Sequence, residues 1–173
     1  MRGTRLHPKT TAPQPYSKQV AAMMTYPLLL EKFKTLLKEN RLKFTRQREL
    51  ILKFLYENDG HFTPEEIYTL IKQSHPDIKI GIATVYRTLT LLENEAIALS
   101  LSFGTQGKKY ELGLKKHHDH LICTACGEII EFFDETIELQ QEKIAEKFNF
   151  KMTDHSMKII GLCEKCRDEN TIL

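Results

Sequence analysis

The sequence predicts an α+β protein with a helical first half, a β-hairpin near its middle and a small α/β unit at the end. Three observations indicate this order. Apolar residues recur at helical spacing between residues 27 and 96, two short strand-like segments flank a turn at residues 104–107, and all four cysteines lie in the second half. A chain of 173 residues is long enough to form two small domains.

Four helices are predicted in the first half, each from an apolar stripe and a suitable first residue. The first begins at about Pro27, where proline fits the first turn, and the second follows Thr45 as its N-cap. The third starts at Thr63-Pro64-Glu65-Glu66, which is a capping box with proline at its first helical position. The fourth spans about Gly81 to Ala96 and turns one stripe inward, made of Val85, Leu89, Leu92 and Ala96.

A β-hairpin is predicted directly after these helices. Residues 98–103 and 108–112 read as strands around the turn Gly104-Thr105-Gln106-Gly107. Helices followed by a hairpin form a winged helix, the helix-turn-helix variant whose recognition helix enters the major groove of DNA. We therefore expect a winged-helix domain over residues 25–104, with wing strands to about residue 113 and a wing or hinge segment at 105–113.

The predicted winged helix carries residues suited to DNA. The outer face of the fourth helix is small near its start and has Arg87, with Thr84 and Tyr86 on its flanks. Residues 41–48 contain four cations and no acid at the start of a helix, where phosphates find free N–H donors. These features predict DNA binding, and a merely solvated basic surface is the alternative.

The net charge of +2 is unevenly distributed along the chain. Residues 1–24 carry four basic side chains and no acidic one, for a net charge of +4. Residues 25–113 carry 13 basic and 11 acidic side chains, for +2. Residues 114–173 carry 8 basic and 12 acidic side chains, for −4. The first half is therefore expected to attract polyanions, and the second half is expected to attract cations. Residues 1–24 also hold three of the six prolines, and they are predicted to be a disordered basic leader.

The four cysteines form two CxxC pairs, Cys123 with Cys126 and Cys163 with Cys166. A two-residue spacer lets both thiolates of a pair bind one ion, so the pairs predict a tetrahedral Cys₄ structural zinc site. Disulfides or a thioredoxin-like redox pair are alternatives. Neither a secretory signal nor a long apolar run is present, so the chain is predicted to be cytoplasmic, with reduced thiols and no membrane partner.

The segment His117-His118-Asp119-His120 predicts a different kind of metal site. It continues into the apolar Leu121-Ile122, so it reads as a strand whose side chains alternate between two faces. His118 and His120 then share one face, while His117 and Asp119 share the other, and one strand can serve two sites. Nitrogen and oxygen ligands suit Fe(II), Mn, Co or Zn. A solvated polar strand is the alternative.

The rest of the second half predicts a small α/β unit over residues 114–173. A partner strand is expected at 128–133, a helix from Asp134 to about Phe148, and a further strand at 150–162 that leads to the second CxxC pair. Zinc bound by both pairs would hold this unit together.

Taken together, these motifs resemble the ferric uptake regulator (Fur) family from about Tyr26 to Cys166, in particular its members from Campylobacter and Helicobacter, which also carry two CxxC pairs. The matching segments are Leu42-Lys43, Thr45-Arg46-Gln47-Arg48, His61, Thr63-Pro64-Glu65-Glu66-Ile67-Tyr68, residues 81–89, Lys109-Tyr110-Glu111, and the histidine run with Cys123 and Cys126. The resemblance implies a homodimer with N-terminal winged-helix domains and C-terminal dimerisation and metal-binding domains. It implies no small-molecule substrate.

The resemblance also implies which residues bind metal and DNA. A regulatory Fe(II) site, which Zn, Mn or Co can fill in vitro, matches His61, Glu111, His118, His120 and Glu131. An additional metal site matches His117, Asp119, Glu138 and His155. The implied contacts to an A·T-rich inverted repeat in double-stranded DNA are Lys43, Arg48, Thr84, Tyr86 and Arg87. The implied function is an Fe(II)-sensing transcriptional regulator, mainly a repressor of iron-uptake genes, and not an enzyme.

Several other functions are alternatives to this one. A peroxide sensor of the family typically has aspartates where Glu111 and Glu131 stand, and a zinc sensor typically has a cysteine among its regulatory ligands. Iron sensing is therefore preferred, with Zn or Mn sensing as alternatives. A zinc-dependent hydrolase is disfavoured because no HExxH helix is present. A thiol oxidoreductase and a purely structural dimerisation module are the remaining hypotheses.

Overall fold

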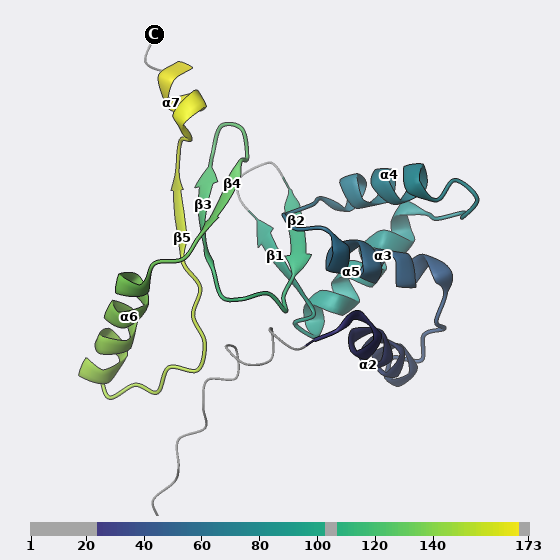
Figure 1. The fold of residues 1–173 in the computed structure, drawn as a ribbon, viewed down its shortest axis with the longest axis horizontal. Coiled ribbons are helices and arrows are strands. Elements are labelled where there is room, and N and C mark those ends of the chain that lie inside the picture. Colours follow the sequence, from purple (N-terminus) through teal and green to yellow (C-terminus); the bar gives the residue numbers. More distant parts are fainter. Residues whose placement is uncertain (1–23, 103–106, 170–173) are drawn as a thin grey trace, which may run out of the picture.

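The computed structural model describes residues 24–102 and 107–169. The helices are α2 (Tyr26–Glu39), α3 (Arg46–Glu57), α4 (Pro64–Ser74), α5 (Ile82–Asn94), α6 (Glu135–Lys147) and α7 (Glu164–Glu169). The strands are β1 (Ala98–Ser102), β2 (Lys108–Leu112), β3 (Asp119–Cys123), β4 (Ile129–Phe132) and β5 (Lys158–Gly161). The α2–α5 helices lie on one side of the β1–β2 hairpin, and the β3–β5 sheet with α6 lies on the other (Figure 1). The predicted α+β class is confirmed.

Three helix starts predicted from the sequence are confirmed by their hydrogen bonds. The Thr45 hydroxyl accepts the N–H of Arg48 at the start of α3, at 3.4 Å. Thr63 and Glu66 form a reciprocal capping box, with distances of 2.7 and 3.1 Å. The Asp134 carboxylate accepts two N–H groups of α6. These side chains satisfy backbone donors that a helix leaves free at its N-terminus.

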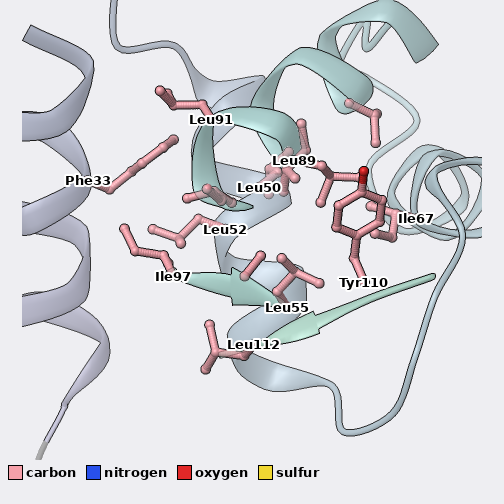
Figure 2. Close-up of a cluster of buried hydrophobic side chains, with 14 of the residues drawn as sticks. Phe33, Leu50, Leu52, Leu55, Ile67, Leu89, Leu91, Ile97, Tyr110 and Leu112 are labelled. Atoms are coloured by element: carbon pink, nitrogen blue, oxygen red, sulfur yellow. The ribbon is translucent and has the colours of Figure 1, made fainter. Parts of the chain in front are cut away.

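The hydrophobic core lies in the first domain. It fills the space between α2–α5 and the hairpin, as Figure 2 shows for the ten labelled side chains. Its members come from every helix of this domain and from both wing strands, and the largest fully buried ones include Phe33, Ile51, Leu52, Leu55, Ile67, Leu89 and Ile97. This domain therefore buries enough apolar surface to position its surface residues rigidly.

The wing hairpin is antiparallel and joins the helices through one loop. Ser100 lies opposite Tyr110 in the hairpin, and Tyr110 also forms a two-way backbone bridge with Phe62, at 2.8 and 3.0 Å. The described part of the first predicted strand ends at Ser102, and most of the predicted turn lies outside the described residues. The predicted leader, apart from its last residue, Met24, also lies outside them.

The second domain contains a sheet in the order β4-β3-β5, with β3 antiparallel to β4 and parallel to β5. The predicted strand at residues 150–162 is wrong in extent, because regular pairing begins only at Lys158. The preceding residues serve β3 in another way: the N–H of Met157 donates to the Asp119 carboxylate and the Met157 carbonyl accepts the N–H of His120. The short helix α7 was not predicted.

The second domain buries little apolar surface of its own. Among its described residues, Ile122 and Cys123 are the buried apolar side chains, whereas Phe148 and Phe150 are 74% and 69% exposed. Figure 1 shows why: α6 extends beyond one end of the sheet instead of covering a face of it. Among residues 24–102 and 107–169, no helix combines the length and the apolar character needed to cross a bilayer.

We expect Thr63→Ala to lower the free energy of unfolding of the first domain by about 1 kcal/mol, because the N-terminus of α4 loses its capping box. Urea titration followed by circular dichroism measures this change. Thr69→Ala is the matched control, since Thr69 lies within the same helix and its hydroxyl only returns to the Glu65 carbonyl. An equal loss in both variants would contradict the capping role.

Candidate metal centres and nucleic-acid interface

The four cysteines meet at one end of the three-stranded sheet. Cys123 ends β3, and the parallel pairing of Cys123 with Gly161 brings the second CxxC pair alongside the first. The four sulfur atoms lie within 4.8 Å of one another, and Cys126 and Cys163 are 3.7 Å apart. No disulfide joins them. Four thiolates about 2.3 Å from a zinc ion would lie about 3.8 Å apart, so the arrangement fits a tetrahedral zinc site.

The thiols of this cluster do not ionise alike. Backbone N–H groups of Cys163, Cys126 and Ala125 donate to Cys123 and lower its thiol pKa to about 6. Hydrogen bonds with the neighbouring thiols raise the pKa of Cys166. Four adjacent thiolates repel one another, so a divalent cation is needed to hold all of them in the charged form.

A second cluster joins the two domains around Glu111. This residue is the next to last of β2, and its side chain is 1% exposed. His61 reaches it because the bridge between Phe62 and Tyr110 fixes the loop beside β2. His61 Nε2 lies 3.3 Å from Glu111 Oε1 and 3.0 Å from His120 Nε2. His118 Nε2 lies 3.1 Å from Glu111 Oε2.

Glu131 lies at the edge of the same cluster. It stands opposite His120 in the β3–β4 register. Its Oε1 atom is 3.6 Å from His61 Nδ1 and 3.8 Å from His118 Nε2, and its side chain is 37% exposed. The tight group of possible ligands consists of His61, Glu111, His118 and His120, with Glu131 beside it.

Backbone and charge orient this cluster. His118 Nδ1 lies 2.8 Å from the Lys116 carbonyl, which directs Nε2 towards the other ligands, as in many metal-binding histidines. Burial alone would raise the pKa of Glu111, but its bonds to His118, His120 and His61 outweigh burial and hold that pKa far below its usual value. Glu111 in turn raises the pKa of His118 to about 9. A divalent cation can replace the protons that balance this buried carboxylate.

A third cluster lies on the other face of β3. His117, Asp119 and His155 offer ligand atoms within 4.8 Å of one another. Glu138 of α6 completes it, with oxygens 3.3 Å from His117 Nε2 and 3.1 Å from His155 Nε2. Asp119 is buried, and its Oδ1 accepts the N–H of Met157. His117 Nε2 is shielded from solvent and has no hydrogen-bond partner among the described residues, which fits a position facing a cation.

The alternation of faces predicted for the histidine segment is confirmed, although His117 and His118 precede the regular strand. His118 and His120 both meet Glu111, whereas His117 and Asp119 meet the α6 side. No sequence pattern indicates the carbonyl of Lys116 or the N–H of Met157, because any residue type supplies a carbonyl and any except proline an N–H.

The predicted DNA contacts lie at the starts of α3 and α5. Lys43, Tyr86 and Arg87 are exposed, and Thr84 is half-buried. The Arg48 guanidinium donates to the Lys43 carbonyl, so part of its role is to fix this loop. The Tyr86 hydroxyl donates to Glu65 of α4, a contact that the sequence did not predict. Gly81 gives α5 no side-chain cap, and its carbonyl accepts the N–H groups of Thr84 and Val85, so only the two N–H groups before Thr84 remain available to an anion at this end.

Comparison with known proteins gives the family. The model described as "Ferric uptake regulator family" matches residues 39–160. The ferric uptake regulation protein of Campylobacter jejuni is 54% identical over 144 residues, which cover 83% of this chain and 92% of that protein. The chain belongs to the ferric uptake regulator family. The corresponding protein of Helicobacter pylori (strain 26695) is 39% identical, over 83% of this chain and 95% of that protein.

Solved structures of the family agree in fold. The Helicobacter pylori ferric uptake regulator, described as having three functional metal binding sites, superposes with a TM-score of 0.75 at 39% identity, over 84% of this chain and 95% of that one. The Vibrio cholerae ferric uptake regulator gives a TM-score of 0.64 at 38% identity, over 76% of this chain and 99% of that chain. The chain is thus a metal-dependent transcriptional regulator and not an enzyme, and the hydrolase and oxidoreductase hypotheses are wrong.

We expect Cys123→Ser to remove the zinc and to unfold or monomerise the second domain, because structural zinc supplies folding free energy that its small core cannot. Metal analysis of the purified protein and sedimentation velocity measure both effects. Ala125→Ser changes an exposed residue between two of the cysteines and serves as the control. A zinc-free dimer of Cys123→Ser would contradict the Cys₄ assignment.

Proposed function

We propose that this regulator senses Fe(II) and acts mainly as a repressor of iron-uptake genes, binding an A·T-rich inverted repeat as a homodimer. The observation that carries the proposal is the convergence of ligands from both domains. His61 follows α3 of the helical domain, yet it lies 3.0 Å from His120 of the sheet domain. An ion bound there would join the domain that reads DNA to the domain that forms the dimer.

The three clusters would hold different metals because their donor atoms differ. Thiolates favour zinc, so Cys123, Cys126, Cys163 and Cys166 would form a permanent structural site. Imidazoles and carboxylates suit Fe(II), and also Zn, Mn and Co, so the cluster around Glu111 would be the regulatory site. The group of His117, Asp119, Glu138 and His155 would hold an additional ion. Its residues connect β3 to α6, which supports a role in ordering the second domain.

The residues of the regulatory cluster determine how binding becomes a response. Glu111 and His61 belong to the helical domain, while His118, His120 and Glu131 belong to the sheet domain. Bound Fe(II) would supply positive charge that draws both sets together. The ion can shift the angle between the domains only to the extent that it binds more tightly when ligands from both domains meet than when they are apart. Without the ion, His118 Nε2 and His120 Nε2 lie 3.1 and 3.5 Å from the Glu111 carboxylate.

The exposed apolar surface of the second domain supports a homodimer. Phe148, Phe150 and Ile160 are each more than 60% exposed, and β5 is an edge strand of the sheet. A domain with so few buried apolar residues gains stability by covering this surface with a second copy. The second copy also explains the symmetry of the target, since a two-fold dimer presents two recognition helices to two inverted half-sites.

The DNA would be contacted from α5 and from the loop before α3. Arg87 and Tyr86 are exposed on the first turns of α5, where a recognition helix meets base edges, with Thr84 beside them. Lys43 is exposed at the adjacent loop and would enter the narrow minor groove of an A·T tract. Arg48, which holds that loop, would contact phosphate with its remaining donors.

Fluorescence anisotropy tests the proposed function directly. A labelled A·T-rich inverted repeat is titrated with the zinc-loaded protein under anaerobic conditions, with Fe(II) or with a chelator too weak to remove the zinc. We expect Fe(II) to tighten binding by at least about tenfold, with a steep loss of affinity as salt rises. Equal affinity with and without Fe(II), Mn(II) and Zn(II) would contradict the metal response.

We expect His118→Ala to abolish the response of DNA binding to Fe(II) while the protein keeps its structural zinc and remains dimeric. The reason is that His118 bonds directly to the buried Glu111 and belongs to the domain opposite His61. His155→Ala is the matched control, because it removes one imidazole from the additional cluster instead. A His118→Ala protein that still responds to Fe(II) would show that the regulatory site lies elsewhere.

We expect Arg87→Ala to weaken specific DNA binding by about 1–3 kcal/mol, since an arginine at a recognition helix forms hydrogen bonds to base edges. Metal content should not change. Lys143→Ala removes one exposed cation from α6, away from the proposed interface, and controls for net charge. Competition against unrelated DNA distinguishes a specific loss from a general one, and an equal effect of both substitutions would argue against base contact.

A further inference from the structure

The chain between the two domains, residues 113–118, is packed against the first domain at its start. The N–H of Gly113 donates to the Ile97 carbonyl at 2.8 Å. A Cβ atom at Gly113 would lie 2.8 Å from the Ala96 carbonyl oxygen and 2.9 Å from Leu99 Cγ. Glycine is therefore needed here for close approach of two backbone segments, and its presence does not indicate a flexible point.

The next two residues are also attached to the first domain. Leu114 is partly buried against the hydrophobic core of that domain. Lys115 is only 18% exposed and its Nζ atom is shielded from solvent. This atom lies 3.1 Å from Oδ1 of Asp59, whose own side chain is 99% exposed. Asp59 precedes His61 by two residues, in the loop between α3 and α4. Three consecutive residues thus anchor the linker to the domain that carries His61.

The attachments change after Lys115. Lys116 is exposed, and its carbonyl is directed to the His118 ring instead of the first domain. His117 then faces Glu138 of α6, and His118 faces Glu111. The free stretch of chain between the last anchor and the first candidate metal ligand is thus a single residue.

We propose that Lys115 and Asp59 are a positioning pair that places the pivot between the domains at residues 116–118, and not at Gly113. This inference rests on the proposed function, because the pivot serves the metal response. A short pivot next to the ligands makes ligand movement and domain rotation nearly the same motion. A longer, released linker would let the ion bind while the domain orientation stays free.

The chemistry of the pair explains why it can hold the linker. A shielded ammonium group needs a carboxylate close by, so loss of Asp59 leaves a Lys115 charge that is costly to keep there. Lys115 would then turn to solvent and take residues 113–115 with it. Lys115→Met removes the same link to the loop between α3 and α4 and leaves only a solvated Asp59 carboxylate. It should therefore act like Asp59→Asn, and both changes together should add little to either one.

The test uses the full-length, zinc-loaded dimer and two readouts. Hydrogen exchange without Fe(II) reports the linker: the Gly113 amide should be protected in the wild type and should exchange about tenfold faster in Lys115→Met. DNA anisotropy reports the response: the ratio of Kd without Fe(II) to Kd with Fe(II) should fall about threefold to tenfold. Lys116→Met removes the neighbouring, exposed lysine and should leave both readouts unchanged. The double variant Asp59→Lys with Lys115→Asp exchanges the two charges. It should restore part of the Gly113 protection and part of the Kd ratio.

Three results would overturn the inference. These are a Gly113 amide unprotected in the wild type, an effect of Lys116→Met as large as that of Lys115→Met, or additive losses from Asp59→Asn and Lys115→Met. Failure of the proposed function looks different. In that case the wild type shows no response of DNA binding to Fe(II), Mn(II) or Zn(II), while the hydrogen-exchange arm still decides whether the linker is anchored to Lys115.

Discussion

The buried carboxylate of Glu111 is the constraint on which the rest of this structure depends. A charge that is 1% exposed requires compensation, and three imidazoles supply it from two domains. The first domain contributes the rigid frame, because its core fixes β2 and the loop that carries His61. The second domain contributes a strand whose alternating faces present His118 and His120. Candidate metal ligands from both domains thus meet at one buried group.

The two domains solve the problem of stability in different ways. The helical domain has a continuous apolar core between α2–α5 and the wing hairpin, and this core holds α5 in place (Figure 2). The sheet domain buries almost no apolar side chains within the described residues and leaves α6 beyond the sheet (Figure 1). Thiolate and imidazole clusters at both ends of β3 fit a domain ordered by metal and by a second copy of itself. Such a domain is suited to respond to ions.

Much of this arrangement could be predicted from local chemistry. The caps at Thr45, Thr63 and Asp134, the CxxC spacing and the alternation through His117 to His120 all depend on residues that are near one another in the sequence. The convergence of His61 with Glu111 came only from family resemblance, because 50 residues separate them and no spacing rule connects them. The late start of β5 and the contact of Tyr86 with Glu65 were missed. Both depend on which segments pack together, which a single sequence does not encode as a local pattern.

Anomalous diffraction at the iron edge from the Fe(II)-loaded protein tests most directly that one ion joins the two domains. The result we predict is an iron peak at bonding distance from His61 Nε2, with His118 and His120 in the same coordination sphere and zinc retained by the four cysteines. An iron peak surrounded only by groups of the sheet domain, or none near Glu111, would contradict it. The ion would then be unable to couple the helical domain to the sheet domain.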